Sequence, residues 1–446
     1  MTGVHKNKNS SHDKQEDQPH ISGMLRSLRH RNFQLFFSGQ LISLIGTWMQ
    51  TIAQSWLVYR LTGSSLLLGV VGFAGQIPVF LLAPVGGMAA DRWNRHRIVI
   101  GTQVSSMILA FILAALTLLH IVRVWEICVL AALLGAVNAF DIPARQSFLI
   151  DMVGREDLMN AIALNSSMFN GARVIGPAVA GLLVAWIGEG WCFFANAVSY
   201  IAVIAGLLMM QLGPLRQTIT DASPFEHIAE GFRFVRRTKP IFALILLIGL
   251  VSLVAVPYSV LMPIFADRIL HGGARGLGIL MGATGIGALL GALTLAVRRG
   301  VHGLGRWVGI SAMSFGISLI LFSFSKWFWV SVVLLVPVGY SVMLQMSSSN
   351  TLIQAMVPDE LRGRAMAAYT MMFMGMAPMG SLFAGALADR IGAPWTVAIG
   401  GMGAVIGSIV YLRKLPALRF EARQLIVAQG LGGAETVKEM TARGIS

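Results

Sequence analysis

The chain has 446 residues, of which 55% are hydrophobic and only 12% are charged, and its mean hydropathy is +0.71. A soluble globular protein carries roughly 25% charged residues, so a soluble fold is excluded and the apolar surface must mostly face lipid. The formal net charge of +14 would suggest nucleic acid on a soluble domain, but here it lies in short loops, where membrane topology explains it and no nucleic-acid partner is expected.

The N-terminal half begins with a polar segment and continues as six apolar runs. Residues 1–23 contain no apolar core of a signal peptide and predict a disordered cytoplasmic tail. A basic lead-in opens residues 24–212, which predict a six-helix transmembrane bundle. Its helices are expected at about 34–59, 65–89, 98–119, 125–140 (with 146 as the alternative end), 161–187 and 191–212.

The second half repeats this organisation after a polar interruption. Residues 213–240 predict a cytoplasmic linker, in which Phe225 to Arg237 has the spacing of an amphipathic surface helix. Residues 241–412 predict a second six-helix bundle, and residues 413–446 predict a cytoplasmic tail. The helices of this bundle are expected at about 241–264, 277–297, 307–324, 328–350, 365–388 and 395–412.

Lysine and arginine fall mostly on one side of this topology. When the predicted helices alternate, 27 of the 34 lysines and arginines lie on the side that holds both tails and the linker. The opposite side receives six, and Arg173 lies inside a helix. Because positive loops remain in the cytoplasm, both termini are predicted to be cytoplasmic. An even number of helices is also expected, since an odd number would separate the two basic tails.

The two halves are predicted to be copies of one unit. Residues 146–188 align with residues 350–392 without a gap, at an offset of 204 residues. In this register Glu156 falls on Glu360, and the glycines at positions 171, 176, 181 and 188 all fall on glycines. Apolar matches are common among helices, but aligned glycines and an aligned glutamate indicate a duplication. A duplication of this kind predicts two similar six-helix units with an interface between them.

The loop between the second and third predicted helices gathers glycines, a carboxylate and several cations at one membrane face. The glycines allow helix ends to approach closely, Asp91 can accept hydrogen bonds from a helix N-terminus, and the arginines can pair with acids elsewhere. A positively charged cytoplasmic loop without further role is the alternative interpretation. The candidate latch residues of this loop are Gly87, Asp91, Arg92, Arg95 and Arg97.

The end of the fourth predicted helix carries Asp141 and Arg145, which are four residues apart and can pair on one helix face. Two roles are open for Asp141: half of a cytoplasmic gate latch, or the proton carrier. Acids are otherwise almost absent from the predicted helices, so proton coupling would depend on Asp141.

The fifth predicted helix combines a glycine series with a charge. Gly171, Gly176 and Gly181, with Pro177, predict a smooth and bendable surface on which another helix can lie. Arg173 near the middle of the helix is costly in lipid unless it faces water or an acid. It predicts attraction of an anionic or polar substrate or pairing with a coupling carboxylate; a structural pair with a helix carbonyl end is the alternative.

Polar side chains inside the helices are candidates for a central substrate cavity. The first predicted helix carries Gln40, Gln50 and Gln54 within a polar stripe about 100° wide, which lines a cavity or forms interhelix hydrogen bonds. The residues expected to line the cavity are Gln50, Gln54, Asn138, Arg173, Tyr258 and Gln345.

These motifs resemble the major facilitator superfamily of transporters. The loop pattern G-x-x-x-D-R-x-x-R-[RK] is matched by the latch residues from Gly87 to Arg97, the last with one extra residue. The helix 5 run is similar to the G-x-x-x-x-G-P-x-x-x-G motif of the antiporters of this superfamily, which are exporters. Together with the run Pro143 to Phe148, it resembles the exporter branch that includes the enterobactin exporter and drug efflux proteins.

The resemblance implies an all-α membrane protein with twelve transmembrane helices in two pseudo-symmetric six-helix bundles. It implies a secondary active transporter in the cell inner (plasma) membrane, which exports an amphipathic, siderophore- or drug-like molecule by alternating access with proton antiport. A monomer without cofactor or metal is expected. The alternatives are an importer of the same fold, a non-transporting sensor, or a polytopic membrane enzyme. An enzyme would need a motif such as H-E-x-x-H or G-x-S-x-G, which the sequence lacks.

Overall fold

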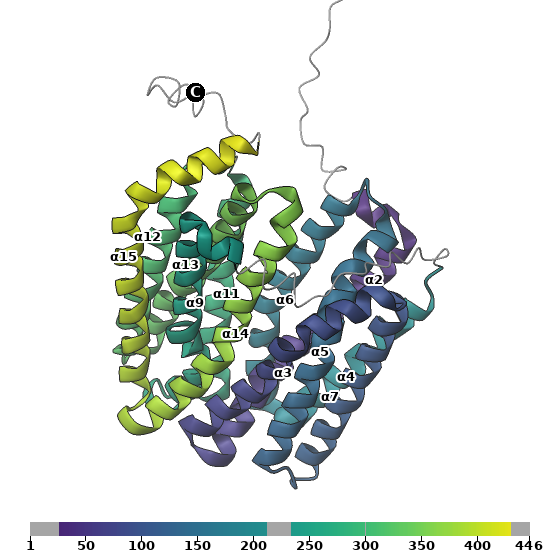
Figure 1. Ribbon diagram of the computed structural model, residues 1–446. Coiled ribbons are helices and arrows are strands. Elements are labelled where there is room, and N and C mark those ends of the chain that lie inside the picture. The colour runs from purple at the N-terminus through teal and green to yellow at the C-terminus, as the bar shows by residue number, and fades with distance from the viewer. Residues whose placement is uncertain (1–25, 212–232, 299, 430–446) are drawn as a thin grey trace, which may run out of the picture.

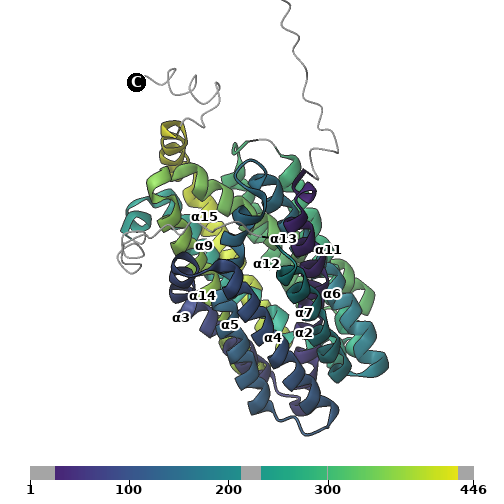
Figure 2. The ribbon, with the colours of Figure 1, turned by 90° about the vertical axis from the view of Figure 1, so that its right-hand side faces the viewer.

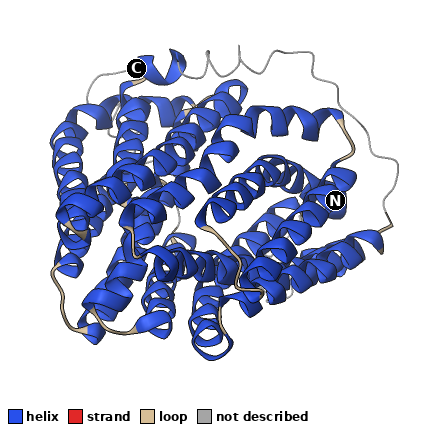
Figure 3. Cartoon of the chain, turned by 90° about the horizontal axis from the view of Figure 1, so that it is seen from below, coloured by secondary structure: helices blue, strands red, loops and turns tan. Residues whose placement is uncertain are grey.

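In the computed structural model, residues 26–211, 233–298 and 300–429 are described, and their regular elements are all helices joined by short loops (Figure 3). The short helix η1 (Arg26–Arg29) precedes the N-terminal bundle, which Figure 2 shows with α3, α4 and α5 toward the viewer. The six helices of this bundle are α2 (Arg31–Thr62), α3 (Ser65–Arg92), α4 (Arg95–Leu118), α5 (Val124–Val153), α6 (Leu158–Ile187) and α7 (Glu189–Leu208).

The C-terminal bundle also has six spans, and its first span is broken. This seventh span of the chain runs as α9 (Lys239–Val254), the 3₁₀ turn η2 (Val256–Leu261), α10 (Met262–Ile264) and the π-helical η3 (Phe265–Ile269). The remaining spans are α11 (Gly273–Val297), α12 (Leu304–Ser323), α13 (Phe328–Met356), α14 (Asp359–Ile391) and α15 (Ala393–Ala428).

Eleven of these spans are long and apolar enough to cross a membrane. The twelfth, α2, has 32 residues and is equally long, but its polar stripe with three glutamines lowers its hydropathy. The predicted arrangement of twelve transmembrane helices in two six-helix bundles is therefore confirmed.

The twelve antiparallel spans define two sides of the molecule (Figure 1). We call the side where α2 begins and α15 ends the terminal side, and the opposite side the distal side. The six cations that the sequence assigns to the poorly charged side lie in or beside the distal loops; they are Arg60, Arg123, Arg268, Arg275, Lys326 and Arg390.

The two bundles keep the register of the internal repeat. Helix α13 begins 204 residues after α5, and α14 ends 204 residues after α6. The equivalent glycines that follow α6 and α14, Gly188 and Gly392, adopt positive φ angles of 85° and 87°. A left-handed residue at a helix end favours glycine, which explains why the alignment contains glycine at this point.

Two helices extend clearly beyond the sequence-based expectation. Helix α5 continues to Val153 and does not end between residues 140 and 146. Helix α15 does not end near Leu412 but continues to Ala428, turning across the terminal side of its bundle (Figure 1). Leu415, Leu418 and Ala422 lie on one face of this extension at helical spacing, while exposed cations interrupt the apolar run in the sequence. Of the expected amphipathic helix 225–237, residues 233–237 are helical and the rest lies outside the described residues.

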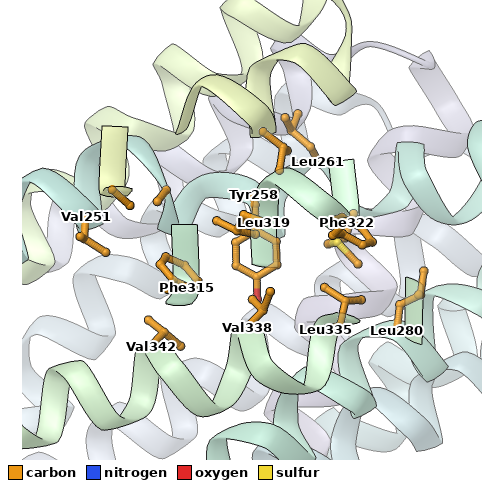
Figure 4. Close-up of a cluster of buried hydrophobic side chains, with 14 of the residues drawn as sticks. Val251, Tyr258, Leu261, Leu280, Phe315, Leu319, Phe322, Leu335, Val338 and Val342 are labelled. Atoms are coloured by element: carbon orange, nitrogen blue, oxygen red, sulfur yellow. The ribbon is translucent and has the colours of Figure 1, made fainter. Parts of the chain in front are cut away.

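The buried apolar side chains show where the bundles are joined. The C-terminal bundle has one continuous core around Tyr258, Phe315 and Phe322 (Figure 4). Within the described residues, the N-terminal bundle contributes to this core only from its distal half, for example through Leu57 and Phe193. Its terminal half has a separate core of its own. The bundles thus share a core on the distal side and have independent cores on the terminal side.

Candidate functional site

Two helix pairs close the distal side between the bundles, and glycine makes both contacts possible. Helix α6 crosses α11 where a Cβ added at Gly181 would lie 2.8 Å from the Cα of Gly278. Helix α14 crosses α3 where a Cβ added at Gly69 would lie 3.0 Å from the Cα of Gly385 (Figure 1). Side chains at these positions would push the helices apart. We call these contacts the α6–α11 seam and the α3–α14 seam.

Polar contacts add to the distal closure. The Tyr59 hydroxyl of α2 donates a hydrogen bond to Asp267 Oδ2 of η3 at 2.8 Å. Arg268 Nη2 donates to the Gly63 carbonyl oxygen at 3.1 Å, and its guanidinium lies 5.6 Å from the Tyr59 ring centroid. The broken seventh span therefore binds the loop that joins α2 to α3 in the opposite bundle.

Arg173 lies at the terminal end of the α6–α11 seam. A Cβ at Gly285 of α11 would lie 3.1 Å from the Arg173 carbonyl oxygen, whereas a Cβ at Gly171, half a turn further along α6, would have no neighbour within 4 Å. The half-buried guanidinium lies 5.7 Å from the Trp48 ring centroid. Among the described residues, Arg173 has no ion pair with a carboxylate.

The polar stripe of α2 divides between two environments. Gln50 is buried and accepts a hydrogen bond from Asn196 Nδ2 of α7 at 2.7 Å. Thr47 Oγ1 lies 3.4 Å from the hydroxyl of Tyr200, which is also in α7. This corrects the expectation that Gln50 lines the cavity, because its amide satisfies a buried partner inside the N-terminal bundle. Gln54 is half-buried and remains accessible beside the exposed Thr51.

Asp141 is the centre of a buried polar cluster in the N-terminal bundle. Its Oδ1 accepts hydrogen bonds from Thr102 Oγ1 at 2.8 Å and from Gln103 Nε2 at 2.9 Å. Its Oδ2 lies 3.1 Å from Arg145 Nη2, the ion pair that the four-residue spacing allows. Helices α4 and α5 are thereby held together by a carboxylate whose two oxygens are both engaged.

The loop between α3 and α4 is only partly engaged in this conformation. Arg95 Nη1 lies 3.4 Å from Asp151 Oδ2 of α5, and Arg95 Nε donates to the Ala90 carbonyl oxygen at 3.1 Å. Within the described part of the chain, the exposed Asp91 and Arg92 have no hydrogen bond or ion pair. Arg97 is also exposed, its side chain has no hydrogen bond or ion pair within the described residues, and its backbone N–H donates to the capping Asn94 at 3.2 Å.

Comparison with known proteins identifies the family to which this architecture belongs. The family model described as transmembrane secretion effector matches residues 22–437. The chain belongs to this family of the major facilitator superfamily.

The transmembrane secretion effector family agrees with the relatives found. The chain is 28% identical to the staphyloferrin A transporter of Staphylococcus aureus over 84% of its own length and 94% of the relative. It is 28% identical to the multidrug efflux pump Tap of Mycobacterium tuberculosis over 89% of its own length and 96% of the relative. The protein is thus a membrane transporter of small molecules and not an enzyme.

A solved structure agrees at the level of the fold. A POT family transporter in complex with a thioalcohol-conjugated peptide superposes with a TM-score of 0.72 at 12% identity, over 87% of this chain and 96% of that one. At this identity the likeness concerns the helix arrangement alone.

The remaining candidates for the substrate cavity differ in how exposed they are in this transporter fold. Tyr258 is buried and packs edge-on against Phe315 at 6.1 Å between ring centroids. Gln345 is 1% exposed and neither amide atom has a partner in the described structure, so it lies in the C-terminal bundle and not on a cavity wall. Asn138 is half-buried on α5.

Several residues of the transporter's site escaped the sequence-based analysis. A Cβ at Gly86 would collide with the Ala139 carbonyl oxygen, so Gly86 and not Gly87 is the close-contact glycine where α3 meets α5. Asn94 caps α4 in place of Asp91. The Arg95–Asp151 pair joins residues 56 positions apart, and no local pattern signals it. Asn94 was recognisable as a standard capping residue directly before the helix.

Proposed function

We propose that this protein is a secondary active exporter of amphipathic small molecules, siderophore- or drug-like, which works by alternating access. The observation that carries the proposal is the position of Arg173 between the bundles, at the end of a seam that closes only the distal half. An exporter must bind its substrate from the cytoplasm, and the more basic terminal side is the proposed cytoplasmic side. The two bundles have separate cores on this side. Relatives named as efflux pumps favour this direction.

The charge distribution supports a plasma-membrane orientation with the terminal side in the cytoplasm. Among the described residues most lysines and arginines lie on the terminal side, and positive loops are retained in the cytoplasm. Both termini would then be cytoplasmic, and the conformation described here would be open to the cytoplasm. A monomer is sufficient, because both bundles of the transport unit belong to one chain.

Arg173 is proposed to attract the anionic or polar part of the substrate. A guanidinium at mid-span is costly unless it meets a counter-charge or water, and no protein carboxylate supplies the counter-charge among the described residues. The neighbouring Trp48 ring supplies an apolar surface, and the accessible Gln54 supplies hydrogen-bonding groups. Such a pair of surfaces suits an amphipathic molecule with a negative group.

Closure of the terminal side is proposed to use the latch loop. Asp91 and Arg92 are exposed in the distal-closed state and are free to bind the opposite bundle when the terminal halves approach. Asp141 is the proposed proton carrier, because protonation would remove its charge and release Arg145. Inward proton movement through Asp141 would thereby be linked to the rearrangement of α4 and α5.

The experiment that tests this proposal measures efflux from cells loaded with carboxyfluorescein, an amphipathic anion, and with ethidium as the cationic comparison. Cells with the wild type should lose carboxyfluorescein faster than empty-vector cells, and a proton uncoupler should abolish the difference. The variants Asp91→Asn and Arg173→Ala should both slow efflux, while the exposed control Arg155→Gln should not. Uncoupler-insensitive efflux would overturn antiport, and faster accumulation with the wild type would identify an importer.

A further inference from the structure

The terminal half of α9 is flanked by two apolar grooves on the surface of the C-terminal bundle. The groove between α9 and α15 has a volume of about 460 Å³, and Gly407 of α15 lies in its lining with Leu250 packed against it. The groove between α9 and α14 has a volume of about 380 Å³ and includes Met372. Phe242 and Leu246 line both grooves. These two side chains therefore form a ridge with one groove on each side.

The α9–α15 groove has the depth of one membrane leaflet. It runs from Lys239 to Leu250 along α9, and the eleven helical steps between these residues span about 16 Å. Half of a bilayer's hydrocarbon core is about 15 Å thick. The ridge side chains Phe242 and Leu246 are 44% and 54% exposed, as large apolar residues are where they face lipid.

Positive charge gathers at the terminal end of both grooves. Arg236, Lys239 and Lys414 line the end of the α9–α15 groove, and Arg233 with Arg236 lines the end of the other. Neither groove has an acidic residue in its lining. None of these four cations has an ion pair or hydrogen bond within the described residues. Within the described residues, the site therefore combines two apolar grooves with cations that have no acidic partner, at the level of the membrane surface.

We propose that the terminal half of α9 binds one anionic phospholipid of the leaflet on the terminal side. Its two acyl chains lie in the two grooves astride the Phe242–Leu246 ridge, and its phosphate lies among Arg236, Lys239 and Lys414. Basic pockets beside transmembrane helices recognise anionic headgroups in this way. A second copy of this chain fits the site poorly, because its terminal side is itself strongly basic and would repel these cations.

Native mass spectrometry of the purified full-length protein tests this proposal independently of transport. The protein in detergent is titrated with dioleoyl phosphatidylglycerol and, separately, with dioleoyl phosphatidylcholine. The wild type should retain one phosphatidylglycerol at a lower concentration than phosphatidylcholine. Each of Arg236→Gln, Lys239→Gln and Lys414→Gln should weaken phosphatidylglycerol binding about fivefold, and the triple variant about a hundredfold.

Two further variants separate a built site from general surface charge. The control triple variant Arg29→Gln, Arg31→Gln and Arg155→Gln removes the same charge from exposed positions of the N-terminal bundle and should leave the preference unchanged. Ala243→Trp fills the α9–α15 groove without changing charge and should weaken binding of both lipids. Circular dichroism and the thermal midpoint confirm that each variant is folded.

Three results would overturn the proposal. The wild type could bind both lipids equally, or the control triple variant could lower phosphatidylglycerol binding as much as the groove triple variant does. A dimer that disappears in the groove triple variant would instead assign the grooves to a second copy of the chain.

Discussion

The α6–α11 seam and the α3–α14 seam are equivalent by the internal repeat, but they differ beyond their glycines. Each has a pair of glycines in backbone contact, Gly181 with Gly278 and Gly69 with Gly385. Gly181 and Gly385 are 204 residues apart, so the duplication preserved this contact in both halves. The next glycines of the repeat, Gly176 and Gly380, also correspond: one packs on α2 and the other on the broken seventh span.

The difference begins one turn further toward the terminal side. Gly375 of α14 lies against the Phe80 ring of α3, whereas the equivalent Gly171 of α6 has open space beside it. The position of Arg173 is occupied by Ala377 in α14. The duplicated glycines thus provide closure in both seams, while the charge and the open space occur in one seam only. A charge in the membrane is costly without a partner, so the proposed substrate contact is assigned to the seam that carries Arg173.

The largest effect is expected where closure itself is blocked. Gly181→Leu places a side chain against the backbone of α11, which cannot yield, so the distal side should remain open and carboxyfluorescein efflux should fall to the empty-vector level. Gly171→Leu on the same helix is the matched control, because its side chain enters open space. Spin-label distances across the α6–α11 seam should increase only in Gly181→Leu. Normal transport by Gly181→Leu would show that closure of the α6–α11 seam is not required for transport.

The next effect isolates the asymmetric charge. Arg173→Gln should lower carboxyfluorescein efflux roughly thirtyfold, since the loss of a charged partner costs about 2 kcal/mol. Arg173→Lys should restore part of the activity, because it keeps the charge but not the planar group. Ala377→Gln at the equivalent position of α14 is the control and should leave efflux within about twofold of the wild type. Equal losses of efflux in Arg173→Gln and Ala377→Gln would show that the side chains at these positions act on the structure of the protein and that Arg173 does not bind the substrate.

A third test compares the buried polar residues at another equivalent pair, Asp141 in α5 and Gln345 in α13. Asp141→Asn leaves Arg145 without its counter-charge and should cost about 3 kcal/mol of stability. Gln345→Leu should be neutral or stabilise by about 1 kcal/mol, because neither amide atom has a protein partner. The apparent thermal midpoint in detergent measures both. A clear loss in Gln345→Leu would reveal bound water at that amide.

The smallest effect concerns the polar contact beside the seams. Tyr59→Phe removes the hydrogen bond to Asp267 but keeps the ring beneath the Arg268 guanidinium. Distal closure should therefore weaken by only about 1 kcal/mol. Spin labels on the distal loops should report a modestly larger open population, with efflux changed by less than fivefold. A complete loss of efflux would show that this bond, and not the glycine seams, controls closure.

The sequence predicted the architecture well because hydropathy and glycine register are local properties. The offset of 204 residues anticipated that α6 and α14 end at equivalent positions, as Gly188 and Gly392 show. The end of α15 was missed because exposed arginines and lysines after Leu412 interrupt the apolar run, although the helical spacing continues.

The site was harder to predict, because periodicity identifies a face of a helix but not its neighbour. The stripe on α2 was found correctly as a polar face, yet Gln50 meets Asn196 of α7 while Gln54 remains accessible. Helical spacing allowed the Asp141–Arg145 pair. The Arg95–Asp151 pair depends on how α5 extends past the membrane, and that requires the three-dimensional arrangement.

The 3₁₀ turn in the seventh span gives this helix an adjustable length. A 3₁₀ helix rises about 2.0 Å per residue and an α-helix about 1.5 Å, so rewinding the six residues of η2 as α-helix would shorten the span by about 3 Å. Asp267 can therefore stay hydrogen-bonded to Tyr59 while α9 slides along its own axis. A change in the length of η2 would thus let α9 move on the terminal side of the membrane before the distal contacts of η3 break.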